Sequence, residues 1–265
     1  MYNLRIIKIE RSPTMPLIDF TKEKFDIIIQ AGQSNSEGTA FGHIDEPYQP
    51  KHNVWHMNGN FTMEIARELV NGNNIQSHYG FAFADEYLKA GRLADDRKLL
   101  ILRTSHSSTG FLDNYWTLTG AFYRRMIEMI DTALSLNPEN RLVAFLWHQG
   151  ENDANLGASY EVHTKHLTDL VTSVREKYNV PVLPFICGDF VQHWKNDNAE
   201  ICRPVIDAMR DFCKGENAAF VESEGLISNA QDEGNSFTRD PIHFCRKSIY
   251  ELGKRYYTAF DSIAK

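Results

Sequence analysis

The sequence predicts an α/β fold in which helices cover both faces of a central parallel sheet. Apolar strand-like runs alternate along the chain with longer amphipathic runs, which is the pattern of such a sheet. The first run, residues 25–30, is rich in β-branched residues, as in a strand that is buried on both faces. With 265 residues and 42% hydrophobic content, the chain is long enough for one large domain. We therefore expect a single domain over residues 1–265, with residues 1–24 packed on it as an extension.

The expected elements follow from apolar spacing and from helix-ending residues. The helix at 79–90 ends at Gly91, a natural C-cap, and the helix at 120–136 has apolar residues at helical intervals and stops before Pro138. Further strands are expected at 98–103, 141–147, 181–187 and 218–222, and further helices at 160–178, 199–213 and 248–264. Residues 39–74 and 225–239 do not fit the alternation. Long loops in a compact domain are usually functional, so we expect both at the sheet edge that carries the site.

Charge and cysteine content exclude several classes of partner. The formal charge is −7 and the chain has no block rich in lysine and arginine, which argues against nucleic acid or an anionic membrane as a partner. The four cysteines show neither a zinc-site spacing nor a dense disulfide framework, so reduced thiols are expected. Residues 1–20 contain no uninterrupted apolar core of a secretion signal, which leads us to expect a cytoplasmic protein.

Three residues from the two ends of the chain suggest a serine hydrolase. Ser34 follows the first predicted strand directly, at the edge where parallel sheets bind ligands. A serine hydroxyl needs a base to take its proton and an acid to orient that base, and His243 and Asp240 can supply the two roles from one loop. The alternative for this pair is that Asp240 caps the coming helix while His243 simply packs. The nucleophile elbow of α/β-hydrolases fits poorly, since Ser36 stands where that motif has a glycine.

The string at residues 147–153 offers amide side chains at the end of the third predicted strand. Acyl transfer builds negative charge on the carbonyl oxygen, which preorganised N–H donors stabilise, so Gln149 and Asn152 are candidates for the oxyanion hole. The alternative is an ordinary polar turn with a helix cap.

Taken together, Gly32-Gln33-Ser34-Asn35, Trp147 to Asp153 and Asp240 to His243 resemble three ordered motifs of the SGNH hydrolase superfamily. Within it they resemble the family of sialic-acid-specific acetylesterases and acetylxylan esterases, carbohydrate esterase family six. The resemblance covers nearly the whole chain from residue 25 onward. It implies a three-layer, flavodoxin-like α/β/α sandwich and a Ser34–His243–Asp240 triad. It also implies deacetylation of an acetylated small-molecule carbohydrate, with no metal and no organic cofactor.

The same resemblance assigns further roles and shows one departure. It implies oxyanion donors at the Ser34 and Ser108 amides and at Gln149 or Asn152, and substrate contacts at Gln33, Glu151 and Trp116. Where relatives carry Gly-Gly-Thr, this chain has Ser107-Ser108-Thr109. If the family's glycine has a positive φ, serine there carries a steric cost, and a shifted loop or weaker activity would follow.

Other interpretations of the same residues stay open at this point. His163 and His166 share a face of one predicted helix, but a zinc site needs three or four ligands, so no metal site is expected. Five residues are candidates either for a sugar-stacking rim or for packing: Trp55, His56, Phe111, Trp116 and Trp194. Two rival functions are a non-catalytic carbohydrate-binding protein on the same fold and a general short-chain esterase or thioesterase. The oligomeric state, the sugar and its acetyl position are not predicted.

Overall fold

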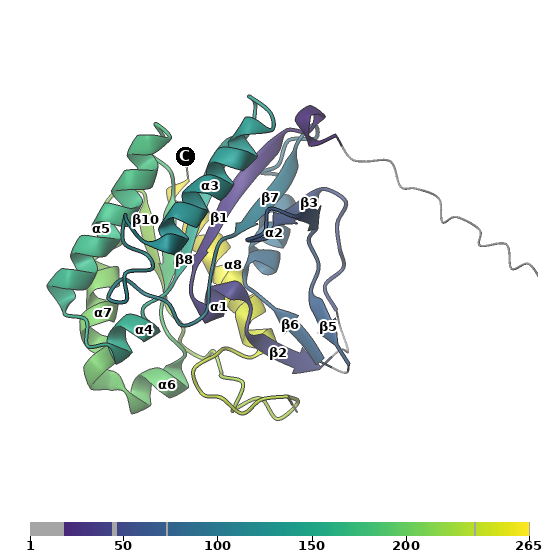
Figure 1. Cartoon of the computed structure of the whole chain (residues 1–265). Coiled ribbons are helices and arrows are strands. Elements are labelled where there is room, and N and C mark those ends of the chain that lie inside the picture. Colours follow the sequence, from purple (N-terminus) through teal and green to yellow (C-terminus); the bar gives the residue numbers. More distant parts are fainter. Residues whose placement is uncertain (1–18, 44–46, 73, 236, 265) are drawn as a thin grey trace, which may run out of the picture.

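A seven-stranded sheet with the strand order β10-β9-β8-β1-β7-β3-β4 forms the centre of the molecule (Figure 1). The computed structural model describes residues 19–43, 47–72, 74–235 and 237–264. All neighbouring pairs in the sheet are parallel except β3 and β4 at the edge. The strands span β1 Phe25–Gly32, β3 Val54–Met57, β4 Met63–Ile65, β7 Lys98–Arg103, β8 Arg141–His148, β9 Phe185–Gly188 and β10 Ala218–Val221.

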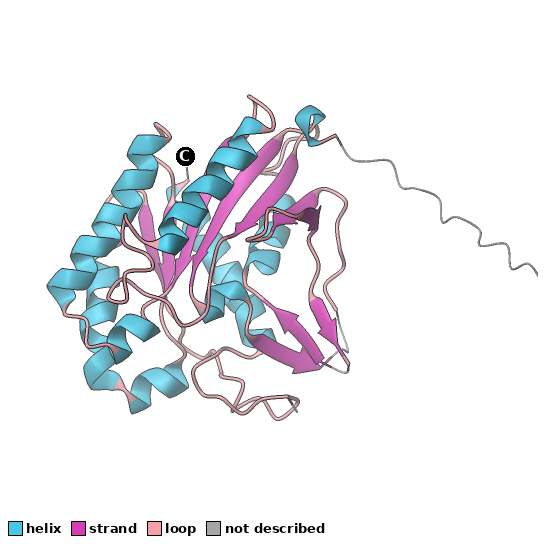
Figure 2. Ribbon diagram, in the orientation of Figure 1, coloured by secondary structure: helices cyan, strands magenta, loops and turns pink. Residues whose placement is uncertain are grey.

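Helices lie on both faces of this sheet, as Figure 2 shows. One face packs against α3 Ala121–Ser135, α5 Tyr160–Lys177 and α7 Ala199–Phe212, and the other against α2 Gly80–Lys89 and α8 Arg246–Ile263. Alternate residues of β1 supply the two cores: Ile27 and Ile29 belong to the first, and Ile28 to the second. Every residue of β1 is buried, which explains its continuous apolar sequence. The predicted α/β/α sandwich is confirmed.

The predicted elements agree closely with the structure. The strand expected at 98–103 is β7 without change, and the helices expected at 79–90, 120–136, 160–178, 199–213 and 248–264 are α2, α3, α5, α7 and α8, with small differences at their ends. The strand expected at 181–187 begins later, at Phe185, because residues 181–182 form a turn. The predicted packing of residues 1–24 lies largely outside the described residues.

The prediction that residues 39–74 form an irregular loop is wrong. This stretch contributes β3 and β4 to the main sheet, and it also forms most of a small antiparallel sheet made of β2 Ala40–His43, β5 Leu69–Asn71 and β6 Asn74–Ser77. These strands are three or four residues long, which is too short for periodicity to reveal. Residues 225–239 are irregular, as predicted. Among the described residues, three short α-helices and one 3-10 helix were not predicted: α1 Ser34–Glu37, α4 Glu151–Asn155, α6 Gln192–Asp197 and η1 Phe20–Lys22.

The sheet topology places Ser34 at a natural binding edge. β1 lies between β7 and β8. After β1 the chain builds β3, β4 and β7 on one side and then crosses to β8, β9 and β10 on the other, and ligands of open α/β sheets bind where the strand order reverses in this way. Gly32 ends β1 at φ 128°, and a Cβ there would lie 2.1 Å from the carbonyl oxygen of His148. Only glycine allows β1 and β8 to approach so closely, and the chain then turns directly into the helix that begins with Ser34.

No helix in the described part of the chain is both long and apolar enough to cross a bilayer.

Candidate active site

Ser34, His243 and Asp240 form a continuous hydrogen-bonded chain. The Oγ of Ser34 lies 2.8 Å from Nε2 of His243, and Nδ1 of His243 lies 2.8 Å from Oδ1 of Asp240. The first residue comes from α1, whereas the other two come from the loop before α8. A serine, a base and an orienting acid at these distances meet the geometric requirement for an activated nucleophile.

The loop that carries Asp240 is held by the second long loop of the sequence. The side chains of Asn229 and Thr238 each donate to Oδ2 of Asp240 at 3.1 Å. The main chain reinforces this arrangement, because the N–H of Asn229 donates to the carbonyl of His243 at 2.8 Å, and that of Ala230 to the carbonyl of Asp240 at 3.0 Å. Both carboxylate oxygens of Asp240 are therefore fixed before any substrate binds.

Asp240 is set to remain ionised. Burial by itself would raise the pKa of this carboxyl, but the hydrogen bond and charge of His243 and the hydrogen bond from Asn229 outweigh it, and together they lower the pKa to about 2. An ionised acid at this position holds the Nδ1 proton of His243, which leaves Nε2 free to accept the proton of Ser34.

Asn35 connects the nucleophile's helix to the catalytic loop, a role that the sequence analysis missed. Its Nδ2 donates to the carbonyl of Ile242 at 3.1 Å and to Oε1 of Glu151 at 2.8 Å, while its Oδ1 accepts from the N–H of Phe244 at 3.1 Å. The two bonds to the main chain lie on either side of His243. Asn35 therefore fixes the position of the imidazole relative to Ser34.

The substrate-binding role predicted for Glu151 is corrected by its position. This carboxyl is fully buried beneath Asn35, and its Oε2 has no hydrogen-bond partner among the described residues. Burial raises the pKa of Glu151 to about 6. The nearby Nε2 of His148, at 3.8 Å from Oε1, does not form an ion pair with it, because burial lowers the pKa of His148 to about 3. Glu151 therefore supports the site indirectly, by accepting the hydrogen bond that orients Asn35.

Gln33 and Trp116 are also structural rather than exposed to substrate. Oε1 of Gln33 accepts from the N–H groups of Gly150 and Asn152, at 3.3 and 3.1 Å, and so caps α4. Trp116 is fully buried and its indole N–H donates to Thr109 at 2.9 Å. The sugar-stacking rim is wrong as well, because at least nine-tenths of every one of its candidates is buried: Trp55, His56, Phe111, Trp116 and Trp194.

Of the two amide side chains proposed for the oxyanion hole, the structure favours Asn152. Gln149 is fully buried and its Nε2 donates to Asp153 at 3.0 Å, which removes it from any oxyanion. Asn152 is partly exposed and donates one N–H to Oδ2 of Asp113 at 2.7 Å. Since an amide nitrogen carries two donors, one N–H of Asn152 has no partner among the described residues.

The other two donors expected for an oxyanion hole are the main-chain N–H groups of Ser34 and Ser108. Ser34 is the first residue of α1, where N–H groups lack an intrahelical acceptor. Ser108 is exposed at φ 56°, and its N–H has no hydrogen-bond partner in the described part of the structure. The neighbouring Ser107 donates from its N–H and its hydroxyl to Oε2 of Glu37, at 2.6 and 2.5 Å, which ties this turn to α1. Position 108 therefore has the positive φ that a glycine would suit.

Neither a metal site nor a disulfide is formed by the described residues. No group of three or more metal-ligating side chains occurs among them, and His163 instead lies 3.4 Å from the buried Asp153. All four cysteines are free thiols, although the sulfur atoms of Cys187 and Cys213 are only 3.4 Å apart.

Solved structures share the fold of this chain, and one curated protein is similar in sequence to part of it. A structure from Arabidopsis thaliana has a TM-score of 0.70 at 20% identity and covers 91% of this chain and 99% of its own; NanS has a TM-score of 0.74 at 17% identity and covers 91% and 98%. A curated protein of Escherichia coli strain K12, described as a probable 9-O-acetyl-N-acetylneuraminic acid deacetylase, is 28% identical over 90 residues. That match spans 31% of this chain and only 27% of the relative.

The family model described as carbohydrate esterase, sialic acid-specific acetylesterase, matches residues 24–262, which includes all three motifs and every residue of the hydrogen-bonded chain from Ser34 to Asp240. The protein therefore belongs to the family of sialic acid-specific acetylesterases among the carbohydrate esterases.

Proposed function

We propose that this protein removes O-acetyl groups from a carbohydrate through an acyl-enzyme formed on Ser34. The observation that carries the proposal is the Ser34–His243–Asp240 chain, with both hydrogen bonds at 2.8 Å. Membership of a carbohydrate esterase family supports the same reaction class.

The chemistry follows from the positions of the polar atoms. His243 accepts the proton of Ser34 through Nε2 as Oγ attacks the acetyl carbonyl carbon, and Asp240 stabilises the imidazolium. The oxyanion receives hydrogen bonds from the N–H groups of Ser34 and Ser108 and from the side chain of Asn152. His243 then returns the proton to the departing sugar oxygen. In the second half of the cycle water attacks the acetyl-enzyme, again with His243 as the base, and acetate and the free serine are regenerated.

Acetate release from a panel of esters tests this proposal. The panel contains 9-O-acetyl-N-acetylneuraminic acid, acetylated xylo-oligosaccharides and p-nitrophenyl acetate, each incubated with wild type and with Ser34→Ala. We expect wild type to release acetate from at least one acetylated sugar and Ser34→Ala to release none above the uncatalysed rate. Equal release by both proteins would refute the role of Ser34. Sugar binding without any release would point to a non-catalytic protein, and release from p-nitrophenyl acetate alone to a general esterase.

A further inference from the structure

Two cysteines that are separated in the sequence have their sulfur atoms in contact. The Sγ of Cys187 lies 3.4 Å from the Sγ of Cys213, and both side chains are free thiols. Cys187 belongs to β9, whereas Cys213 directly follows α7. The two thiols are close enough for a small movement of one side chain to join them in a disulfide.

The fold holds the two cysteines with different firmness. β9 is paired on both sides, and Trp147 of β8 and Phe220 of β10 lie opposite Cys187. Cys213 instead stands at the C-cap of α7, and the chain turns through residues 214–217 before β10 begins. The ends of a helix adjust more easily than a strand inside a sheet. The movement that joins the two sulfur atoms is therefore expected at Cys213.

The access of solvent to the two thiols is also unequal. Cys187 is fully buried, whereas Cys213 is partly exposed. Burial and the neighbouring thiol of Cys213 raise the pKa of Cys187 well above that of an ordinary thiol. Because oxidation follows thiolate character and exposure, a small oxidant reacts first with Cys213. Cys187 is then in place to react with the oxidised sulfur.

The other two cysteines of the chain have different surroundings. Cys202 lies on α7 and is 1% exposed, and burial raises the pKa of its thiol to about 12. Cys245 is fully buried, and its thiol donates to Oγ of Ser248 at 3.4 Å. Among the described residues, Cys187 and Cys213 are therefore the one pair of cysteines in contact.

A bond between these two sulfur atoms would close one connection of the central sheet. β9 and β10 are neighbouring parallel strands, and the chain between them forms α6 and α7. Cys187 lies near the start of this connection and Cys213 near its end, so the bond would enclose the 25 residues from Gly188 to Phe212. A cross-link over such a loop restricts the unfolded chain and so stabilises the folded one.

We propose that Cys187 and Cys213 are a redox-active pair that hydrogen peroxide converts into a reversible disulfide, and that this disulfide stabilises the fold. The Cys213 thiolate first attacks one oxygen of the peroxide, the O–O bond breaks, and Cys213 becomes a sulfenic acid as one water is released. The Cys187 thiol then attacks the sulfenic sulfur, the S–S bond forms, and a second water leaves. The two sulfur atoms together lose the two electrons that reduce the peroxide, and a thiol reductant reverses the change. No step at Ser34 is needed, so the inference is independent of the proposed function.

Counting free thiols tests the proposal on the unaltered protein. Wild type is treated with hydrogen peroxide, denatured and alkylated with N-ethylmaleimide, and its mass is measured. We expect four labels before oxidation, one for each cysteine, and two fewer afterwards, with a peptide that links Cys187 to Cys213 in the digest. Dithiothreitol should restore all four labels. An unchanged number of labels after oxidation, or a disulfide between other cysteines, would overturn the proposal.

Three variants test the order of the two reactions. Cys213→Ala should keep all of its remaining thiols after peroxide treatment. Cys187→Ala should form no disulfide but should hold a sulfenic acid on Cys213, which dimedone traps and mass spectrometry locates. Cys202→Ala is the matched control on α7 and should form the disulfide as wild type does. A sulfenic acid that forms on Cys187 as fast as on Cys213 would contradict the proposed order.

Thermal unfolding tests the effect of the disulfide on stability. We expect the Tm of oxidised wild type to exceed that of reduced wild type by about 5 °C or more, because the cross-link restricts the unfolded chain. The Tm of Cys213→Ala should be the same before and after peroxide treatment. An equal rise in both proteins would assign the effect to another oxidation, and an unchanged Tm in wild type with the disulfide formed would refute the stabilisation.

Discussion

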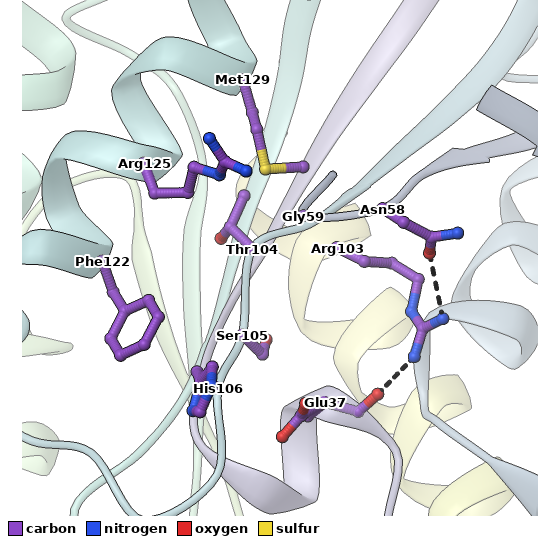
Figure 3. A pocket seen from close by; sticks show the side chains of 10 residues that line it. All are labelled: Glu37, Asn58, Gly59, Arg103, Thr104, Ser105, His106, Phe122, Arg125 and Met129. Atoms are coloured by element: carbon purple, nitrogen blue, oxygen red, sulfur yellow. Dashed lines mark hydrogen bonds between the residues drawn. The ribbon is translucent and has the colours of Figure 1, made fainter. Parts of the chain in front are cut away.

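The loop that carries Asp240 and His243 and the end of β7 that carries Arg103 both contact α1, the helix of Ser34, but their polar groups are paired differently. In the loop, both carboxylate oxygens of Asp240 accept hydrogen bonds and the main chain is paired with residues 227–230. At the end of β7, Arg103 has a buried Nε with no partner among the described residues, and its two hydrogen bonds go to neutral oxygens of Asn58 and Glu37 (Figure 3). A catalytic group must be fixed before the reaction, whereas a binding group must keep donors free for the ligand. The polar groups of the catalytic loop are therefore hydrogen-bonded within the fold, whereas Arg103 keeps a donor without a partner among the described residues.

Removing the nucleophile or its base should give the largest effect. Ser34→Ala and His243→Ala are each expected to lower kcat by roughly 10⁴-fold or more, because the members of a triad act as a unit. Ser36→Ala is the matched control in the same turn, since the Oγ of Ser36 bonds Tyr79 and Ser105 rather than the triad. Initial rates of acetate release measure all three. A Ser36→Ala variant as inactive as Ser34→Ala would mean that the turn, rather than the nucleophile, was disturbed.

Asp240→Asn should disturb the hydrogen bond to His243 while keeping a side chain of nearly the same shape. An amide can present its N–H to Nδ1 of His243 and so favour the wrong tautomer, which we expect to reduce kcat about 10³- to 10⁴-fold with a smaller change in KM. Steady-state kinetics at pH 7 provide the measurement. Near-normal turnover by this variant would show that Asp240 only caps the turn, through its bond to the N–H of His243.

The same substitution has a pH signature in stability. The pKa of Asp240 is about 2 in the folded protein and 3.8 ordinarily, so its carboxylate contributes stability above about pH 4 that is lost as the pH falls toward 2. We expect wild type to exceed Asp240→Asn by about 2 kcal/mol in free energy of unfolding at pH 6, and this difference to shrink between pH 4 and pH 2. Urea unfolding across this range tests it, and a difference that does not change with pH would contradict the assignment.

Glu151 should show the opposite dependence. Its pKa is raised to about 6 by burial, from an ordinary 4.5, so its ionised form destabilises the fold and stability rises as the pH falls from about 6 to 4.5. Glu151→Gln, which keeps an acceptor for Asn35, should be more stable than wild type by about 2 kcal/mol at pH 8 and lose this part of the pH dependence. Thermal unfolding between pH 4.5 and pH 8 is the measurement. Parallel curves for the two proteins would contradict a carboxyl that titrates in this range.

The smallest effect on stability is expected from a substitution of Ser108, the exposed serine with a positive φ. A serine at φ 56° is strained by about 1 kcal/mol relative to glycine, so Ser108→Gly should raise the free energy of unfolding by about that amount and retain the N–H of the oxyanion hole. Ser107→Gly is the informative partner, because it removes the hydroxyl bond to Glu37 and should be destabilising instead. Chemical unfolding compares the two. Stabilisation by both substitutions would show that the bond to Glu37 contributes nothing.

The sequence was sufficient for the regular core and for the hydrogen-bonded triad residues. The long strands and helices have strong periodicity, and Ser34, Asp240 and His243 stand in motifs next to element ends. The short strands within residues 39–74 have too few residues for a periodic signal, and they are defined by pairing with partners far along the chain. Local pattern cannot supply that information.

Side-chain orientation explains the errors at the site. Gln33, Gln149 and Glu151 stand in the right motifs, but their polar atoms turn inward to α4, Asp153 and Asn35. Asn229 and Thr238 reach Asp240 from a loop without any motif. Asn35 could have been identified from the sequence, because it directly follows Ser34 in the first motif. No sequence feature singled out Arg103, because the last residue of a strand is often charged. Its lack of a counter-ion among the described residues is visible only in the structure.

The most direct test of the central claim is to trap the acyl-forming residue covalently. A fluorophosphonate reacts with a serine only when a neighbouring base activates it. Peptide mapping by mass spectrometry after exposure should find one adduct, on Ser34, with loss of esterase activity in proportion to labelling, and no adduct in His243→Ala under the same conditions. Complete inactivation with the label on another residue, or full activity with Ser34 labelled, would contradict the account.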